Sequence, residues 1–117
     1  MQHKWQAFTL VELLIVLAVI GVLATIMFPI IFGGRTSAIN RSAQAHANHV
    51  YKAAIAYIIS TSDDLVTSND CTTGYFAGAF SAPNPGGGIT NCTVNASATG
   101  SPIVTVTSSA GITYSLP

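Results

Sequence analysis

Residues 8–32 form the most apolar segment of the chain, and residues 13–34 contain no charged side chain. A helix needs roughly 20 consecutive apolar residues to cross the hydrocarbon core of a bilayer, so this segment is long enough to span a membrane. The short flank before it, residues 1–7, carries Lys4. A positive flank holds the N-terminus on the cytoplasmic side, which predicts that the rest of the chain faces outward.

A second helical pattern follows directly, over residues 35–60. Apolar side chains recur there at spacings of three and four, at Ile39, Ala43, Ala47, Val50, Ala54 and Tyr57. This period indicates one buried face of an amphipathic helix. If the two segments join, the helix has ~50 residues and a length of ~75 Å. Most of such a helix cannot be covered by this small chain alone.

Three residues near the junction oppose a continuous helix. Pro29 lacks a backbone donor and its ring clashes with the preceding turn. Gly33 and Gly34 each cost about 1 kcal/mol in a helix interior. We therefore expect a kinked or locally unwound stretch between about Ala24 and Gly34, with Thr36 or Ser37 capping a restarted helix.

The second half of the chain, residues 61–117, alternates short apolar runs with turn-forming residues. The strand candidates are residues 73–80, 89–95, 102–108 and 111–117, and residues 81–88 are a loop rich in Pro and Gly. The last two runs alternate well and are joined by a tight turn, which predicts a hairpin. The predicted fold class is α+β, with a long N-terminal helix packed against a small antiparallel sheet.

The composition narrows the classes of function. Only 7% of the residues are charged and the net charge is zero, so the chain offers no basic surface for nucleic acid. The sequence contains no evident nucleophile–base pair, glycine-rich phosphate loop or metal cluster. We therefore expect neither enzyme activity nor a cofactor.

Two cysteines, Cys71 and Cys92, lie in the half predicted to face outward. In an exported chain an even pair predicts a disulfide. A bond that closes a loop of about 20 residues is worth roughly 3 kcal/mol in the loop-entropy description. The alternative is a pair of free, buried thiols.

Other candidate ligands are sparse. His46 and His49 are three apart on the predicted helix and supply half of a metal site, although solvated or subunit-contact positions are the preferred interpretation. Asp63, Asp64 and Asp70 offer oxygen ligands of the type calcium takes, without the regular spacing of a calcium loop. We therefore assign no metal site.

The stretch FTLVELLIVLAVIGVLATIMFP, residues 8–29, resembles the N-terminal signature of type IV pilins and of their relatives, the pseudopilins. The match runs without a gap from Phe8 through Glu12 and Gly21 to Pro29. It covers only the N-terminal part of the chain. The remainder agrees with the family in architecture: a helix, a loop, a small sheet and one disulfide.

The resemblance implies a processing pathway. Residues 1–7 correspond to a leader that a membrane prepilin peptidase removes by cutting after Ala7, and the new terminal residue, Phe8, is then N-methylated. The family usually has glycine where this chain has Ala7. It also often shows an unwound stretch near the position of Pro29.

Glu12 stands out because a carboxylate in an apolar setting costs several kcal/mol unless it is paired. The resemblance implies that this residue is needed for assembly. The expected partner is the amine of Phe8, freed by cleavage, on a neighbouring subunit. Such a pair would fix the axial register between subunits, as a buried polar residue does in a coiled coil. The alternative is that Glu12 only favours the positive end of the helix dipole.

The resemblance implies a structural subunit of a type IV pilus. Residues 8–34 form the membrane and filament-core helix, residues 35–60 its amphipathic continuation, and residues 61–117 the sheet domain. Before assembly the subunit crosses the inner membrane once. The pilus assembly machinery then builds it into a homo-oligomeric helical filament outside the cell, serving twitching motility, adhesion or DNA uptake.

Two alternatives remain open. A pseudopilin of a type II secretion system shares the signature, although major pseudopilins usually carry a calcium loop and no disulfide. A membrane-anchored binding domain that never polymerises predicts no cleavage after Ala7. The basic residues outside the membrane, Arg35, Arg41 and Lys52, all lie on the helix and are expected to face the core, which argues against DNA binding by the body of a fibre.

Overall fold

The computed structural model describes residues 7–62, 69–96 and 100–117. Contacts divide the chain into two compact units, Met1–Arg35 and Thr36–Pro117. We call the second unit the head domain. The predicted leader, including Lys4, lies outside the described residues except for Ala7.

The helix α1 (Leu10–Thr61) is 52 residues long and continues through Pro29, Gly33 and Gly34. The predicted unwound stretch and the restart at Thr36 or Ser37 are therefore wrong for this structure. A break would leave up to four donors and four acceptors without partners, whereas an unbroken helix forfeits the single hydrogen bond that Pro29 cannot donate. A bend at Pro29 without a break stays a prediction.

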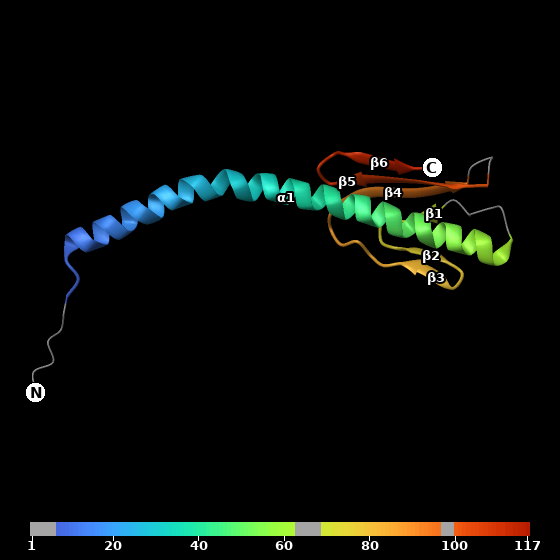
Figure 1. Ribbon diagram of the computed structural model, residues 1–117, viewed down its shortest axis with the longest axis horizontal. Coiled ribbons are helices and arrows are strands. Elements are labelled where there is room, and N and C mark those ends of the chain that lie inside the picture. Colours follow the sequence, from blue (N-terminus) through green and yellow to red (C-terminus); the bar gives the residue numbers. More distant parts are fainter. Residues whose placement is uncertain (1–6, 63–68, 97–99) are drawn as a thin grey trace, which may run out of the picture. The chain divides into compact units, whose positions relative to one another are not determined.

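Within the residues that the structure describes, six strands follow the helix and form two antiparallel sheets (Figure 1). The larger sheet has the order β1-β4-β5-β6, and the smaller is a hairpin of β2 and β3. Their bounds are Asn69–Asp70 for β1, Tyr75–Ala77 for β2, Phe80–Ala82 for β3, Ile89–Ala96 for β4, Pro102–Ser108 for β5 and Thr113–Leu116 for β6. The predicted α+β fold, a long helix with a small antiparallel sheet, is confirmed.

The predicted C-terminal hairpin is also confirmed. Strands β5 and β6 pair from Thr107 opposite Thr113 to Val104 opposite Leu116. In the turn, the Gly111 N–H donates to the Ser108 carbonyl at 2.9 Å, and Gly111 has a φ of +89°. A left-handed conformation of this kind suits glycine because it has no Cβ.

The run predicted as one strand over residues 73–80 is instead split by a turn. It holds β2, a turn at Gly78 and the start of β3, which extends into the predicted loop and leaves residues 83–88 as the loop. Gly78 has a φ of +60°, and a Cβ built there would lie 3.1 Å from the Tyr57 ring. A turn that combines positive φ with close packing explains why this position favours glycine.

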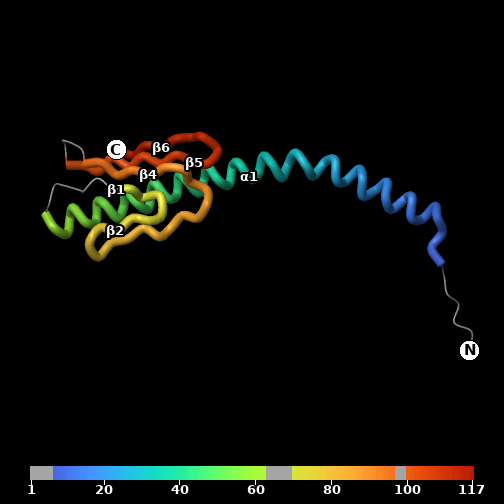
Figure 2. Tube along the Cα trace, turned by 180° about the vertical axis from the view of Figure 1, so that it is seen from behind, coloured from blue at the N-terminus to red at the C-terminus, as the bar shows by residue number. Residues whose placement is uncertain are grey.

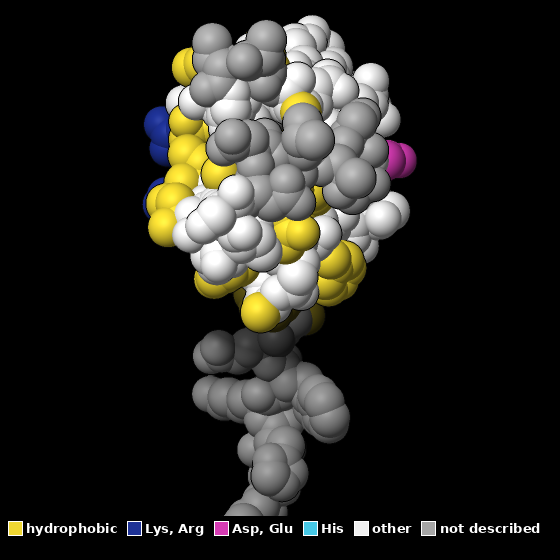
Figure 3. All heavy atoms as spheres, turned by 90° about the vertical axis from the view of Figure 1, so that its right-hand side faces the viewer, with side chains coloured by type: hydrophobic (Ala, Val, Ile, Leu, Met, Phe, Trp, Pro, Cys, Tyr) yellow, Lys and Arg dark blue, Asp and Glu magenta, His cyan; other side chains and the backbone are white. Residues whose placement is uncertain are grey.

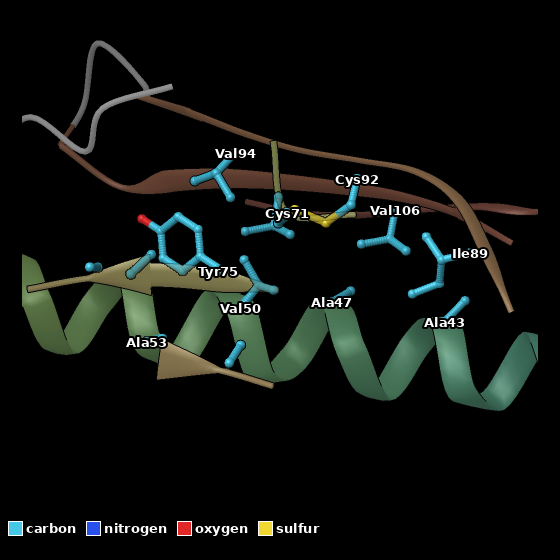
Figure 4. Close-up of a cluster of buried hydrophobic side chains, with 14 residues drawn as sticks. Ala43, Ala47, Val50, Ala53, Cys71, Tyr75, Ile89, Cys92, Val94 and Val106 are labelled. Atoms are coloured by element: carbon cyan, nitrogen blue, oxygen red, sulfur yellow. A yellow bond between two sulfur atoms is a disulfide. The ribbon is translucent and has the colours of Figure 1, made fainter. Parts of the chain in front are cut away.

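The core of the head domain lies between one face of α1 and the inner face of the larger sheet (Figure 4). The helix contributes mainly small residues, Ala43, Ala47, Val50, Ala53 and Ala54, and the sheet contributes Val94, Val104 and Val106 among others. The predicted helix face is thus confirmed at its four central positions, while its end members, Ile39 and Tyr57, are half-buried. Alanines allow the helix to lie close to the sheet.

Both sheets lie along the same half of the helix. In two opposite views, residues 36–61 of α1 run lengthwise beside β4, β5 and β6 (Figures 1 and 2). The hairpin of β2 and β3 adds Tyr75, Ala77 and Ala82 to the core. Burial raises the pKa of the Tyr75 phenol, with a smaller contribution from Tyr57, so this hydroxyl stays protonated at neutral pH.

Replacing Val50 by alanine tests this core. Val50 is fully buried, so we expect the change to lower the free energy of unfolding of the head domain by about 2 kcal/mol. Chemical denaturation of the detergent-solubilised chain, followed by tyrosine fluorescence, measures the effect. The matched control is Ile59→Ala on the same helix, where 75% of the side chain is exposed and the change should stay within about 0.5 kcal/mol. Equal losses at both positions would contradict the described packing.

Candidate functional site

The start of α1 is held by a reciprocal pair of hydrogen bonds between Thr9 and Glu12. The Thr9 N–H donates to Glu12 Oε2 at 3.0 Å, and the Glu12 N–H donates to Thr9 Oγ1 at 3.3 Å. The Thr9 carbonyl accepts from the Leu13 N–H at 3.3 Å, which places Thr9 at the cap position. This arrangement is a capping box, which satisfies two backbone donors that a helix end otherwise leaves unpaired.

Glu12 therefore has a local structural role in the single chain. Thr9 was not among the predicted site residues, although the pattern T-x-x-E directly before an apolar run is the known signal for this cap. The alternative of a helix-start role for Glu12 thus has direct geometric support. Because the Glu12 side chain is exposed, its carboxylate also remains accessible to a second partner.

Ala7 and Phe8 lie just before the helix, outside any regular element. Both are exposed, and 80% of the Phe8 side chain is accessible. A shallow depression is lined by Ala7, Phe8, Thr9 and Glu12. The structure therefore brings the predicted cleavage residues and the predicted assembly residue together at one end of α1. An exposed peptide bond without helical hydrogen bonds is the kind of bond that a peptidase can reach.

The N-terminal part of α1, residues 10–32, presents apolar side chains in every direction. The large hydrophobic residues between Leu10 and Phe32 are each at least 52% exposed. The helix is long and apolar enough to cross a membrane, and none of its most apolar stretch is buried within the chain. A helix that is apolar all round needs an apolar environment on all sides, either lipid or other helices.

Comparison with known families bears on this end of the chain. A family model described as the prokaryotic N-terminal methylation motif matches residues 6–28. The chain carries a prepilin signature. This signature is typical of the precursors of type IV pilins and pseudopilins. Comparisons with curated proteins and with solved structures gave no match.

The prepilin signature spans Ala7, Phe8 and Glu12, so the matched segment contains the exposed peptide bond, the cap and most of the apolar helix. It fits membrane anchoring before assembly and processing by a prepilin peptidase. Proteins with this motif are structural rather than catalytic.

The predicted disulfide between Cys71 and Cys92 is present, with Cα atoms 4.9 Å apart. It joins the segment after β1 to strand β4, and both cysteines are fully buried. The Asp70 carboxylate holds the adjoining turn, because it accepts hydrogen bonds from the hydroxyl and the N–H of Thr72. These hydrogen bonds lower the pKa of Asp70.

The histidines and aspartates considered as metal ligands do not come together in the part of the chain that the structure describes. His46 is buried, and its Nε2–H donates to the Cys71 carbonyl at 2.8 Å, whereas His49 is exposed. Of the three aspartates considered for calcium, Asp63 and Asp64 lie outside the described residues, and Asp70 is exposed and engaged by Thr72. The preferred interpretation of the two histidines as solvated or contact positions thus fails for His46, because its ring is buried in the head domain.

Proposed function

We propose that this chain is a type IV pilin, cleaved after Ala7, methylated at Phe8 and polymerised through α1 into a helical surface filament. The observation that carries the proposal is the apolar segment of α1. The chain leaves this segment exposed on all sides, and the prepilin signature includes most of it. Thousands of identical helices packed side by side would bury that surface. The head domain would then form the outside of the fibre.

The Ala7–Phe8 bond has the accessibility that the proposed cleavage requires. Cleavage converts the Phe8 N–H into an ammonium group one residue before Thr9. Within the chain, Glu12 already accepts the Thr9 N–H. In a filament core we propose that Glu12 pairs with the Phe8 ammonium of a neighbouring subunit, because enclosure in an apolar bundle makes an unpaired charge costly.

The character of the head domain fits an outer surface with little charge. In the end-on view, Lys and Arg atoms lie at one edge, Asp and Glu atoms lie at the opposite edge, and most other coloured atoms are uncharged (Figure 3). The cations Arg35, Arg41 and Lys52 are all exposed on α1, so the expectation that they face the core is wrong. We propose contacts through polar, uncharged groups for the fibre surface, and we propose no DNA-binding role for it.

The disulfide favours a pilin over a pseudopilin of a type II secretion system. Intact mass spectrometry of material sheared from cells that express the chain tests the whole proposal. We expect an abundant species that begins at Phe8 and carries one added methyl group. A chain that begins at Met1 and stays in the membrane fraction would support the anchored, non-polymerising alternative. A processed chain confined to the periplasm and membrane would support the pseudopilin.

The control for processing is the pair Ala7→Gly and Ala7→Leu. Glycine is the residue usual in the family at this position, so Ala7→Gly should be cut at least as completely as the native chain. A large side chain at the exposed scissile bond should block cutting. Equal cutting of all three chains would show that Ala7 does not contribute to recognition.

A further inference from the structure

Three side chains that bind soft and borderline metals meet in the centre of the head domain. His46 comes from α1, Cys71 follows β1, and Cys92 lies in β4. Their ligand atoms all lie within 4.8 Å of one another, and the residues are 4%, 0% and 0% exposed. Sequence spacing does not reveal this cluster, because His46 and Cys71 are 25 positions apart in the chain.

The cluster is positioned by contacts that do not depend on the sulfur–sulfur bond. The His46 Nε2–H donates to the Cys71 carbonyl, and the Cys71 N–H donates to the Cys92 carbonyl at 3.1 Å. The hydrogen bond from the Thr72 N–H to the Asp70 carboxylate holds the turn that contains Cys71. Val94 and Val106 pack beside the cysteines in the core (Figure 4). Reduction of the disulfide therefore leaves several interactions that keep the three residues together.

We propose that the reduced head domain binds one thiophilic divalent metal ion, of which Zn²⁺ is the best fit, through Cys71, Cys92 and His46. A dithiol reductant supplies two electrons and two protons and is itself oxidised to a disulfide, which leaves two thiols in the chain. On binding, each thiol releases its proton and each sulfur donates an electron pair to the metal. The His46 nitrogen donates a third pair in place of its hydrogen bond to the Cys71 carbonyl.

The geometry and the charge of the cluster suit such an ion. Zn–S bonds of about 2.3 Å and Zn–N bonds of about 2.0–2.1 Å in a tetrahedron place ligand atoms roughly 3.5–3.8 Å apart, within the observed spread. Two thiolates neutralise the double charge of the ion, so the buried site holds no net charge. Water completes a four-coordinate site.

A groove offers a route to the cluster. It lies between α1 and residues 83–85, and His46 forms part of its wall. His49 lines the same groove and is exposed to solvent. His46 is thus the point at which the buried cluster meets the surface. In a reducing environment the ion would join α1, the segment after β1 and strand β4, whereas in an oxidising environment the disulfide joins only the last two.

The experiment uses the full chain in detergent micelles, reduced with a non-thiol phosphine and titrated with Co²⁺, followed by competition with Zn²⁺. We expect one Co²⁺ per chain, with a thiolate charge-transfer band and the intense visible bands of tetrahedral cobalt, both lost when Zn²⁺ is added. The oxidised chain should give neither band. The absence of a stoichiometric band in the reduced chain would overturn the proposal, and so would equal binding by the oxidised chain.

The variants separate this site from incidental thiolate binding. Cys71→Ser should abolish the tetrahedral bands, and His46→Gln should weaken binding by on the order of 100-fold, since the loss of even a supporting residue costs 10- to 100-fold. His49→Gln is the matched control and should leave the affinity unchanged. An unchanged affinity in His46→Gln would refute the histidine ligand. If His46→Gln fails to fold, cadmium NMR of the native chain decides between a ligand set with nitrogen, which supports the proposal, and one without it, which overturns it.

Discussion

Replacing Glu12 by glutamine is expected to leave the subunit in the membrane while lowering the yield of sheared filaments by on the order of 100-fold or more. Removing one partner of a buried ion pair costs about 3–5 kcal/mol, and each 1.4 kcal/mol is a factor of ten in an equilibrium constant. In the proposed filament the loss leaves the Phe8 ammonium group enclosed without a counter-charge. The measurement is the ratio of sheared to membrane-bound subunit by immunoblot.

Glutamine is the informative substitution because it retains the capping box. Its side-chain oxygen can still accept the hydrogen bond that the Thr9 N–H now donates to Glu12. Glu12→Ala removes both the cap and the charge. If the charge matters, the two variants should lose filaments alike, whereas a capping role predicts a normal yield from the glutamine variant alone.

Thr9→Ala completes the set, because it removes the capping hydroxyl and keeps the carboxylate. The lost cap costs about 1 kcal/mol at the helix start, so the filament yield should stay within about ten-fold of the native value. A normal yield from Glu12→Gln together with a large loss from Thr9→Ala would sink the ion-pair proposal. The role of Glu12 would then be to begin the helix.

Removing the Cys71–Cys92 cross-link is expected to lower the free energy of unfolding of the head domain by about 3 kcal/mol. The two residues are 21 positions apart in sequence, and an open loop of that length adds conformational freedom to the unfolded chain. For a domain of this size the loss corresponds to a fall of roughly 12–24 °C in melting temperature. Thermal unfolding with and without a phosphine reductant, in the presence of a chelator, measures it.

The double variant Cys71→Ser with Cys92→Ser is the control for the disulfide. Its melting temperature should be low and should not respond to the reductant. Intact mass, which rises by two hydrogen atoms on reduction, verifies that the native bond has opened. A native chain that is reduced by mass and yet melts at its original temperature would contradict the predicted contribution of the bond.

The sequence predicted the features that depend on periodicity. The spacing of Ala43, Ala47, Val50 and Ala54 determines which face of α1 is buried, and the structure buries these residues. The alternation along residues 102–108 and the turn after them determine the β5–β6 hairpin. In both cases neighbours in sequence are also neighbours in space, so a local pattern carries the information.

The errors arose where a local signal had to be weighed against its surroundings. Pro29 is unfavourable in a helix, yet the apolar helix continues on both sides of it. Gly78 ends a strand because its conformation and its contact with Tyr57 favour glycine, which a count of apolar residues cannot show. His46 was assigned to the surface because its contact with Cys71 joins distant parts of the chain. Such contacts follow from the tertiary fold and produce no periodic pattern in the sequence.

The absence of a polar stripe between Leu10 and Phe32 constrains how a subunit can pass from the membrane into a fibre. Each large side chain there is more than half exposed, so no rotation of the helix in water would hide this surface. Passage from lipid into a bundle of like helices exchanges one apolar environment for another, and the hydrophobic contribution nearly cancels. Release into water would instead expose the whole segment and favour aggregation. Growth and shrinkage of the proposed fibre must therefore occur at the bilayer, where lipid or neighbouring helices cover the apolar segment throughout the transfer.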